Sequence, residues 1–166
     1  MDGHIISILV ENQAGVLSRV SGLFSRRGYN IDSLSVGETE DPSRSRITIA
    51  VKGDAMVIDQ IVKQVNKLAD SVSVVELRHG DSVYRELALI KIKAPTEKRM
   101  EIIGIVDIFR ANIIDVSPSA VIAEITGETS KIDAFVEIVE PYGIVEIART
   151  GLTGLSRGST AINTEP

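Results

Sequence analysis

The sequence predicts an α+β protein built from two βαββαβ units in tandem. Short apolar runs rich in β-branched residues alternate with stretches whose apolar residues recur at helical spacing. This order of elements occurs twice, in residues 1–78 and again in residues 85–151. Residues 79–84 are predicted to be a linker. Residues 152–166, which are rich in Gly, Ser and Thr, are predicted to be a flexible tail.

The first half reads as strand, helix, strand, strand, helix, strand. Its predicted strands are residues 4–10, 30–36, 47–51 and 72–77. A helix follows the first strand because Val16, Val20 and Leu23 recur at intervals of four and three residues. It is expected to end near Gly28, since glycine commonly terminates helices in the left-handed conformation. Asp54 is the candidate N-cap of the second helix.

The second half repeats this order. Its predicted strands are residues 87–93, 113–116, 121–125 and 145–150. One helix follows Pro95-Thr96, and Thr129 or Ser130 is the expected cap of the other. Two strands joined as a hairpin in the middle of each half are typical of the ferredoxin-like fold, in which a four-stranded antiparallel sheet carries both helices on one face.

Composition narrows the possible functions. The net charge of −5 does not favour nucleic-acid binding, which needs a basic face. The absence of cysteine excludes disulfides, thiolate metal ligands and a cysteine nucleophile. No basic region precedes an apolar leader, and no apolar run approaches the roughly 20 residues of a membrane span. We therefore expect a cytoplasmic protein without a membrane partner.

The sequence offers little catalytic chemistry. His79, Asp81 and Ser82 are the residue types of a hydrolytic triad, but a triad needs groups that converge from separate elements, and these lie in one short stretch. Glu38, Glu40 and Asp41 belong to a polar hairpin loop, residues 37–46, that is predicted to be longer than most. A hard cation could bind there, yet a solvated acidic loop is the favoured interpretation. We predict neither catalytic nor metal-binding residues.

The stretch Asn12-Gln13-Ala14-Gly15 lies between the first strand and the first helix. A helix start leaves backbone N–H groups without partners, and the helix dipole favours an anion there, so this turn could bind a carboxylate. Asn30, at the start of the second predicted strand, is expected to face this turn. A plain polar turn whose glycine serves backbone geometry fits the pattern equally well. The second half has Lys93-Ala94-Pro95-Thr96 at the corresponding place.

The chain resembles the ACT-domain family of acetolactate synthase (acetohydroxyacid synthase) small subunits. The segments that carry the resemblance span nearly the whole chain and are Glu11–Leu17, Arg26–Leu34, Phe109–Val116 and Gly154–Gly158. The first half would then be the ACT domain and the second half the second ferredoxin-like domain of a small subunit.

The resemblance implies a regulatory subunit without catalysis of its own. Its partner would be a catalytic large subunit that holds thiamine diphosphate, Mg²⁺ and FAD. The small subunit would activate it and confer feedback inhibition by valine, or by leucine or isoleucine. ACT domains of this family form a homodimer or higher oligomer, with the effector at the contact between chains. The effector-binding positions carried over are Asn12, Gly15, Val16, Leu17, Asn30 and Ile31.

A stand-alone ferredoxin-like enzyme and an RNA-binding module are the alternatives. Sheets that bind RNA carry aromatic residues on their exposed strands. The predicted central strands carry Ser7, Thr48 and aliphatic residues in those places, so the sequence disfavours the RNA-binding alternative.

Overall fold

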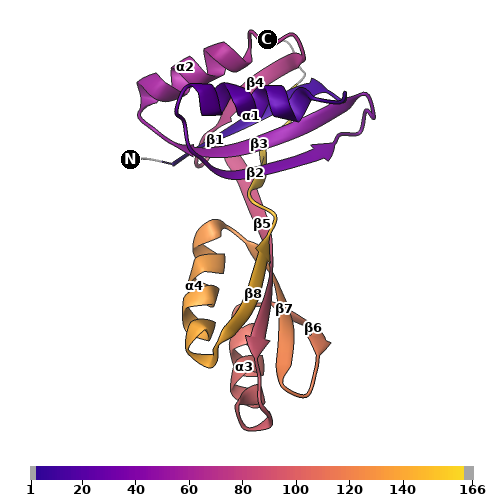
Figure 1. Cartoon of the computed structure of the whole chain (residues 1–166), viewed down its shortest axis with the longest axis vertical. Helices are drawn as coiled ribbons and strands as arrows, with labels where there is room; N and C mark the ends of the chain where they lie inside the picture. The colour runs from indigo at the N-terminus through magenta and orange to yellow at the C-terminus, as the bar shows by residue number, and fades with distance from the viewer. Residues whose placement is uncertain (1–2, 163–166) are drawn as a thin grey trace. The chain divides into compact units, whose positions relative to one another are not determined.

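A computed structural model describes residues 3–162 of the chain. The chain divides into two compact units (Figure 1). The first contains residues 3–83 together with residues 152–162, and the second contains residues 84–151. Within the described residues, no helix is both long and apolar enough to cross a membrane.

The first unit has the predicted βαββαβ order. Its elements are β1 (Gly3–Glu11), α1 (Val16–Arg26), β2 (Ile31–Glu38), β3 (Arg44–Lys52), α2 (Ala55–Val65) and β4 (Ser71–Leu77). The four strands form one sheet in the order β2-β3-β1-β4, with antiparallel neighbours throughout. Alternate residues of β1 and β3, such as Ile8 and Ile49, are buried beneath both helices, which contribute Val20 and Ile61 to the same core. The ferredoxin-like prediction is confirmed.

The helix ends follow the local chemistry that the sequence predicts. The backbone N–H of Tyr29 donates to Phe24 O at 3.0 Å, and Gly28 takes a positive φ of 72°, so α1 ends in a left-handed turn. Asp54 caps α2, because its carboxylate accepts a hydrogen bond from the Val57 N–H at 2.9 Å.

The hairpin between β2 and β3 is shorter than predicted. Only residues 39–43 connect the strands, because polar residues at both ends of the expected loop continue the ladder; Glu38, for example, pairs with Ser45. Asp41 holds the turn, since its Oδ1 accepts from the Ser43 backbone N–H at 2.9 Å and from the Ser43 hydroxyl at 2.7 Å. No local pattern of the sequence predicts strand structure for such polar residues.

The second unit repeats the architecture. Its elements are β5 (Ser82–Lys93), α3 (Thr96–Ile108), β6 (Asn112–Val116), β7 (Ala120–Gly127), α4 (Thr129–Val139), the 3₁₀ turn η1 (Glu140–Tyr142) and β8 (Ile144–Arg149). The strand order is β6-β7-β5-β8. Phe109 and Phe135 pack edge to face in its core, with ring centroids 5.3 Å apart. The predicted cap of α4 is wrong: Glu128 occupies the cap position without a side-chain hydrogen bond, and Thr129 already lies in the helix.

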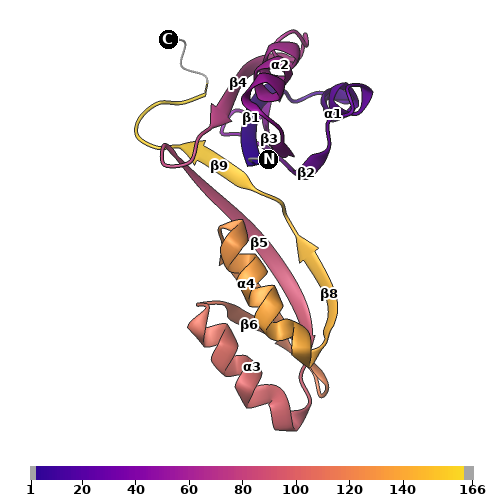
Figure 2. The same cartoon turned by 90° about the vertical axis from the view of Figure 1, so that its left-hand side faces the viewer.

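The predicted linker and the predicted tail both contain residues that lie in strands. β5 begins at Ser82, inside the expected linker, and β9 (Thr153–Ser156) lies inside the expected tail. The tail segment packs on the first unit: Ser35 Oγ donates to Leu152 O at 2.8 Å, and the Arg157 N–H donates to Asp81 O at 2.8 Å (Figure 2). Residues 163–166 lie outside the described residues.

A buried carboxylate ties three elements of the second unit together. Glu86 of β5 is only 5% exposed and accepts two hydrogen bonds from Arg149, at 2.7 and 2.8 Å. Arg149 also donates to Asp133 of α4 at 2.8 Å. The bidentate bond to Glu86 is the main cause that raises the pKa of the Arg149 guanidinium above its usual range. The guanidinium thus links β5, β8 and α4.

We expect Arg149→Met to lower the free energy of unfolding by about 2–3 kcal/mol, because it leaves the Glu86 carboxylate buried without a cation. The double variant Glu86→Leu/Arg149→Met should recover most of this loss, since no buried charge remains. Urea unfolding at fixed protein concentration measures both. Lys63→Ala, which breaks an exposed ion pair with Asp59, is the control and should change stability by less than about 0.5 kcal/mol. Equal midpoints for Arg149→Met and Lys63→Ala would contradict the role given to Glu86.

Candidate functional site

The turn before α1 has the backbone geometry of an anion site. Gly15 is the N-cap residue and has a φ of 84°, a left-handed conformation that side chains disfavour. The first intrahelical bond runs from Arg19 N to Gly15 O at 3.0 Å. The N–H groups of Leu17 and Ser18 precede that bond and are therefore directed out of the helix start. Together with the helix dipole they favour a carboxylate.

Contacts with neighbouring elements fix this turn in place. The Asn12 backbone N–H donates to Ser43 O at 2.7 Å, in the β2–β3 hairpin. On the other side, Arg19 donates to the Asp70 carboxylate at 2.6 Å, and the Glu11 N–H donates to Asp70 O at 2.9 Å. The turn is thus held between the hairpin and the start of β4, which preorganises the donors at the start of α1.

The Asn12 side chain has a defined orientation. Its Nδ2 donates to Glu38 Oε1 at 3.0 Å and to Pro42 O at 2.9 Å. Both amide hydrogens are thereby used, and the amide oxygen is the part of this side chain that can accept a hydrogen bond from a ligand. Asn12 is exposed, so a ligand can reach it.

Three of the predicted positions differ in what they can offer a ligand. Val16 is 3% exposed and belongs to the core, so only its backbone can take part. Leu17 is 40% exposed and can give an apolar contact. Ile31 is half-buried and packs against the core at the start of β2.

The structure does not bring Asn30 to the turn within one chain. Ile31 and His4 both pair with Val51 of β3, so β2 and β1 start at the same end of the sheet, with β3 between them. The turn follows the other end of β1, at Glu11, roughly 20–25 Å along the strand. The expectation that Asn30 faces the turn is wrong for a single chain. The separation follows from the topology of the sheet. Because β1 and β2 run parallel and α1 joins them, Asn12 and Asn30 lie at opposite ends of the sheet.

The acidic hairpin does not gather into a metal site. The two hydrogen bonds from Ser43 hold the pKa of the Asp41 carboxyl below its usual value and engage one of its oxygens. Between residues 3 and 162, no group of three His, Cys, Asp or Glu side chains is arranged to hold a metal ion.

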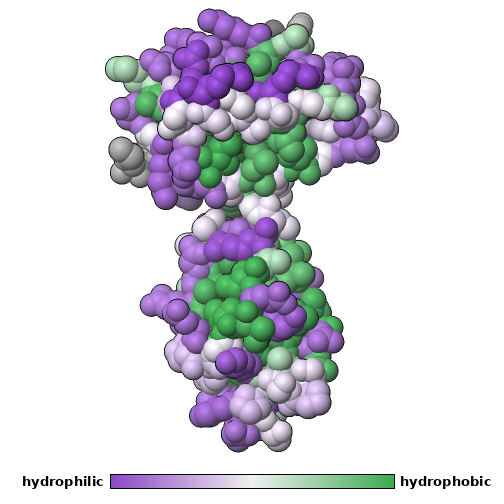
Figure 3. Space-filling view, in the orientation of Figure 1, coloured by the Kyte–Doolittle hydropathy of each residue, from purple (hydrophilic) through white to green (hydrophobic). Residues whose placement is uncertain are grey.

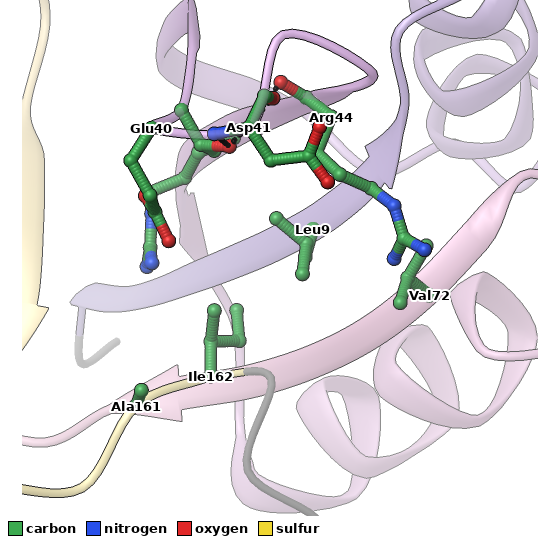
Figure 4. Close-up of a pocket in the computed structure, with 9 residues that line it drawn as sticks. Leu9, Glu40, Asp41, Arg44, Val72, Ala161 and Ile162 are labelled. Atoms are coloured by element: carbon green, nitrogen blue, oxygen red, sulfur yellow. Dashed lines mark hydrogen bonds between the residues drawn. The ribbon is translucent and has the colours of Figure 1, made fainter.

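Sequence reasoning missed a cavity of about 300 Å³ on the helix-free side of the first sheet (Figure 4). The lining residues are Leu9, Thr39, Glu40, Asp41, Arg44, Arg46, Val72, Ala161 and Ile162. Arg46 donates to Ser7 Oγ at 2.9 Å, and its burial lowers the pKa of its guanidinium. No local pattern could have predicted this cavity, because Ala161 and Ile162 reach it from the far end of the chain.

Two family models together match most of the chain. One, described as "AHAS small subunit-like ACT domain", matches residues 6–73, and the other, "Small subunit of acetolactate synthase", matches residues 85–158. The chain is 53% identical over 159 residues to the probable acetolactate synthase small subunit of Methanothermobacter thermautotrophicus, covering 95% of each chain. It is 50% identical over 161 residues to the acetolactate synthase small subunit of Mycobacterium bovis, covering 97% of this chain and 96% of that one.

A solved structure supports the same similarity. The crystal structure of the acetolactate synthase small subunit from Thermotoga maritima superposes with a TM-score of 0.89. The two sequences are 44% identical, and the match covers 96% of this chain and 100% of that one.

Proposed function

The chain belongs to the family of acetolactate synthase small subunits, and from this premise we propose that it activates a catalytic large subunit and makes it sensitive to feedback by valine. This proposal is supported mainly by the sequence identity of about one half to acetolactate synthase small subunits, which extends over both units. The ordered turn at Gly15 supports it as well. Leucine and isoleucine are the closest chemical alternatives, since one methylene changes apolar binding by only about 1–3 kcal/mol.

In the proposed complex, all acetolactate chemistry takes place on the large subunit. Thiamine diphosphate, Mg²⁺ and FAD would bind there and not to this chain. The reaction condenses two pyruvates, or pyruvate with 2-oxobutanoate, to precursors of the branched-chain amino acids. The product of the pathway would then bind to the small subunit, where it has no role in the chemical step.

Free valine suits the Gly15 turn in three respects. Its carboxylate can accept from the N–H groups at the start of α1. The amide oxygen of Asn12 can accept from its ammonium group. The absence of a Cβ at Gly15 leaves room for close approach, and a Cβ there would also come within 3.1 Å of Arg19 Nη1.

A second copy of the chain would supply the missing half of the site. β2 is an edge strand of the first sheet and can pair with another strand. If β2 pairs antiparallel with β2 of a second copy, the start of that second strand lies beside Glu38 of the first chain, and Glu38 already contacts Asn12. Asn30 of the second copy would then face the Asn12 turn. Effector binding would in this way be coupled to the contact between chains.

We expect Gly15→Asp to fold, to activate the large subunit, and to escape inhibition by valine. The added carboxylate would occupy the anion position and repel the carboxylate of valine. The measurement is acetolactate formation by the mixture of both subunits over a valine titration. Gly80→Asp is the control, because Gly80 also has a positive φ, 92°, with open space around it. Normal valine inhibition of Gly15→Asp would exclude the turn as the effector site.

A mixing experiment tests whether the site is shared. Asn12→Ala and Asn30→Ala should each abolish valine binding by calorimetry. In a mixed dimer, one site carries both substitutions and the other carries neither. After exchange of equal amounts, about a quarter of the sites should therefore bind valine again, because half of the dimers are mixed. A site formed by one chain would recover no binding on mixing.

A further inference from the structure

The proposed function gives no role to the cavity on the helix-free side of the first sheet (Figure 4). It encloses about 300 Å³, which is at the lower end of the range for sites that bind small molecules. Among the described residues, none of the positions at the Gly15 turn lines it. The β2–β3 hairpin separates the two places, because Pro42 O and Ser43 O accept hydrogen bonds from Asn12, whereas Glu40 lines the cavity. The cavity is therefore a separate candidate site.

The floor of the cavity is apolar and comes from three separate segments. Leu9 of β1 is 5% exposed, although it pairs with Arg46 on the helix-free face and is no part of the core beneath the helices. Val72 of β4 and Ile162 of the C-terminal segment line the same cavity. Figure 3 shows a different arrangement over the strands of the second unit, an open apolar area in the region of β5 and β8 in Figure 1. An open apolar area is typical of a surface that contacts another protein, whereas a small hollow with an apolar floor is typical of a ligand site.

Two guanidinium groups line the cavity, and neither has a hydrogen-bonded carboxylate among residues 3–162. Arg44 Nε is buried and makes no hydrogen bond, and its ion pair with Glu11 Oε1 is long, at 3.5 Å. Arg46 is half-buried, and its side chain donates to the neutral hydroxyl of Ser7 at 2.9 Å. Leaving a buried donor without a partner costs free energy, and a ligand carboxylate recovers it by accepting a charge-assisted hydrogen bond. The two arginines therefore favour a ligand with a carboxylate.

Two carboxylates at the exposed edge of the cavity balance these cations. Glu40 and Asp41 both line the cavity and are exposed, and Asp41 is already engaged by hydrogen bonds within the hairpin turn. Burial lowers the pKa of the Arg46 guanidinium, and the charge of Glu40 opposes this effect. In Figure 4, the Glu40 carboxylate and the Arg44 guanidinium lie on opposite sides of Leu9. Groups of opposite charge therefore face each other across an apolar floor.

We propose that this cavity binds a free α-amino acid with a small apolar side chain. The ligand carboxylate accepts hydrogen bonds from Arg44 and Arg46, its ammonium group donates to Glu40, and its side chain lies on the apolar floor. A zwitterion complements both signs of charge. A carboxylic acid without the ammonium group is opposed by the exposed carboxylates, and an amine without the carboxylate is opposed by the two guanidinium groups. The inference goes beyond the proposed function, because it adds a second amino-acid site that shares no contact with the predicted effector turn.

The test is binding of L-leucine to the full-length Gly15→Asp variant, in which the turn is blocked. Calorimetry measures the affinity, and the NMR shift of the Ile162 methyl groups shows whether the ligand enters the cavity. Arg44→Gln and Glu40→Gln, each added to this variant, should weaken leucine binding about tenfold, because each removes one charged contact. Arg27→Gln, at the exposed end of α1, is the matched control and should leave binding unchanged.

Two analogues test the choice of a zwitterion. 4-Methylpentanoate has the leucine skeleton without the ammonium group, and 3-methylbutylamine has it without the carboxylate. Each should bind about tenfold more weakly than leucine, because each leaves one charged side of the cavity without its partner. If 4-methylpentanoate binds as tightly as leucine, the cavity is an anion site and the proposal is wrong.

The remaining outcomes separate this inference from the proposed function. If millimolar leucine gives neither heat nor a shift of Ile162, or if Arg44→Gln and Glu40→Gln bind it as well as Arg27→Gln does, the cavity is not an amino-acid site. Valine inhibition of the complex formed by the wild-type chain tests the proposed function independently. Circular dichroism shows whether each variant is folded, and Glu40→Gln carries the test if Arg44→Gln is not, because the Glu40 side chain is exposed.

Discussion

The parallel run of β1 and β2, joined by α1, is the constraint on which the first unit depends. It places the Gly15 turn after the end of β1 and Asn30 before the start of β2, at opposite ends of one sheet. The same crossover buries Val20 and Phe24 of α1 against the strands, so the separation cannot relax without loss of the core. A site that uses both asparagines would therefore have to span two chains, and ligand binding to such a site would be coupled to association.

The C-terminal segment covers part of the helix-free face of the first sheet. A four-stranded sheet with both helices on one face leaves its other face open. Here Ser7 and Thr48 lie on that face yet are 0% and 1% exposed. Residues 152–162 pack on this side, with the Ser35–Leu152 hydrogen bond at one end and Ile162 beside Leu9 at the other. The buried hydroxyl of Ser7 on this face has a hydrogen-bond partner, because Arg46 donates to it at 2.9 Å.

The two units share one architecture but differ at the start of the first helix and in the side chains that their helices expose. At the start of the first helix, the first unit has Gly15 in a left-handed conformation, whereas the second has Pro95 in an extended one. Proline removes an N–H from the helix start, and the second unit lacks the equivalent of Asn12. The second unit exposes Met100 and Ile108 on α3, whereas Ser18 and Arg19 are exposed on α1.

The sequence by itself determined the two βαββαβ units, the Asp54 cap and the termination of α1 at Gly28. Each of these depends on a period of two or 3.6 residues, or on one backbone conformation, and such features are local. Tertiary structure alone decided the ion pair of Glu86 with Arg149, the strand at residues 153–156 and the distance between Asn12 and Asn30. These depend on strand register and on contacts between residues far apart in the chain, which no local pattern encodes.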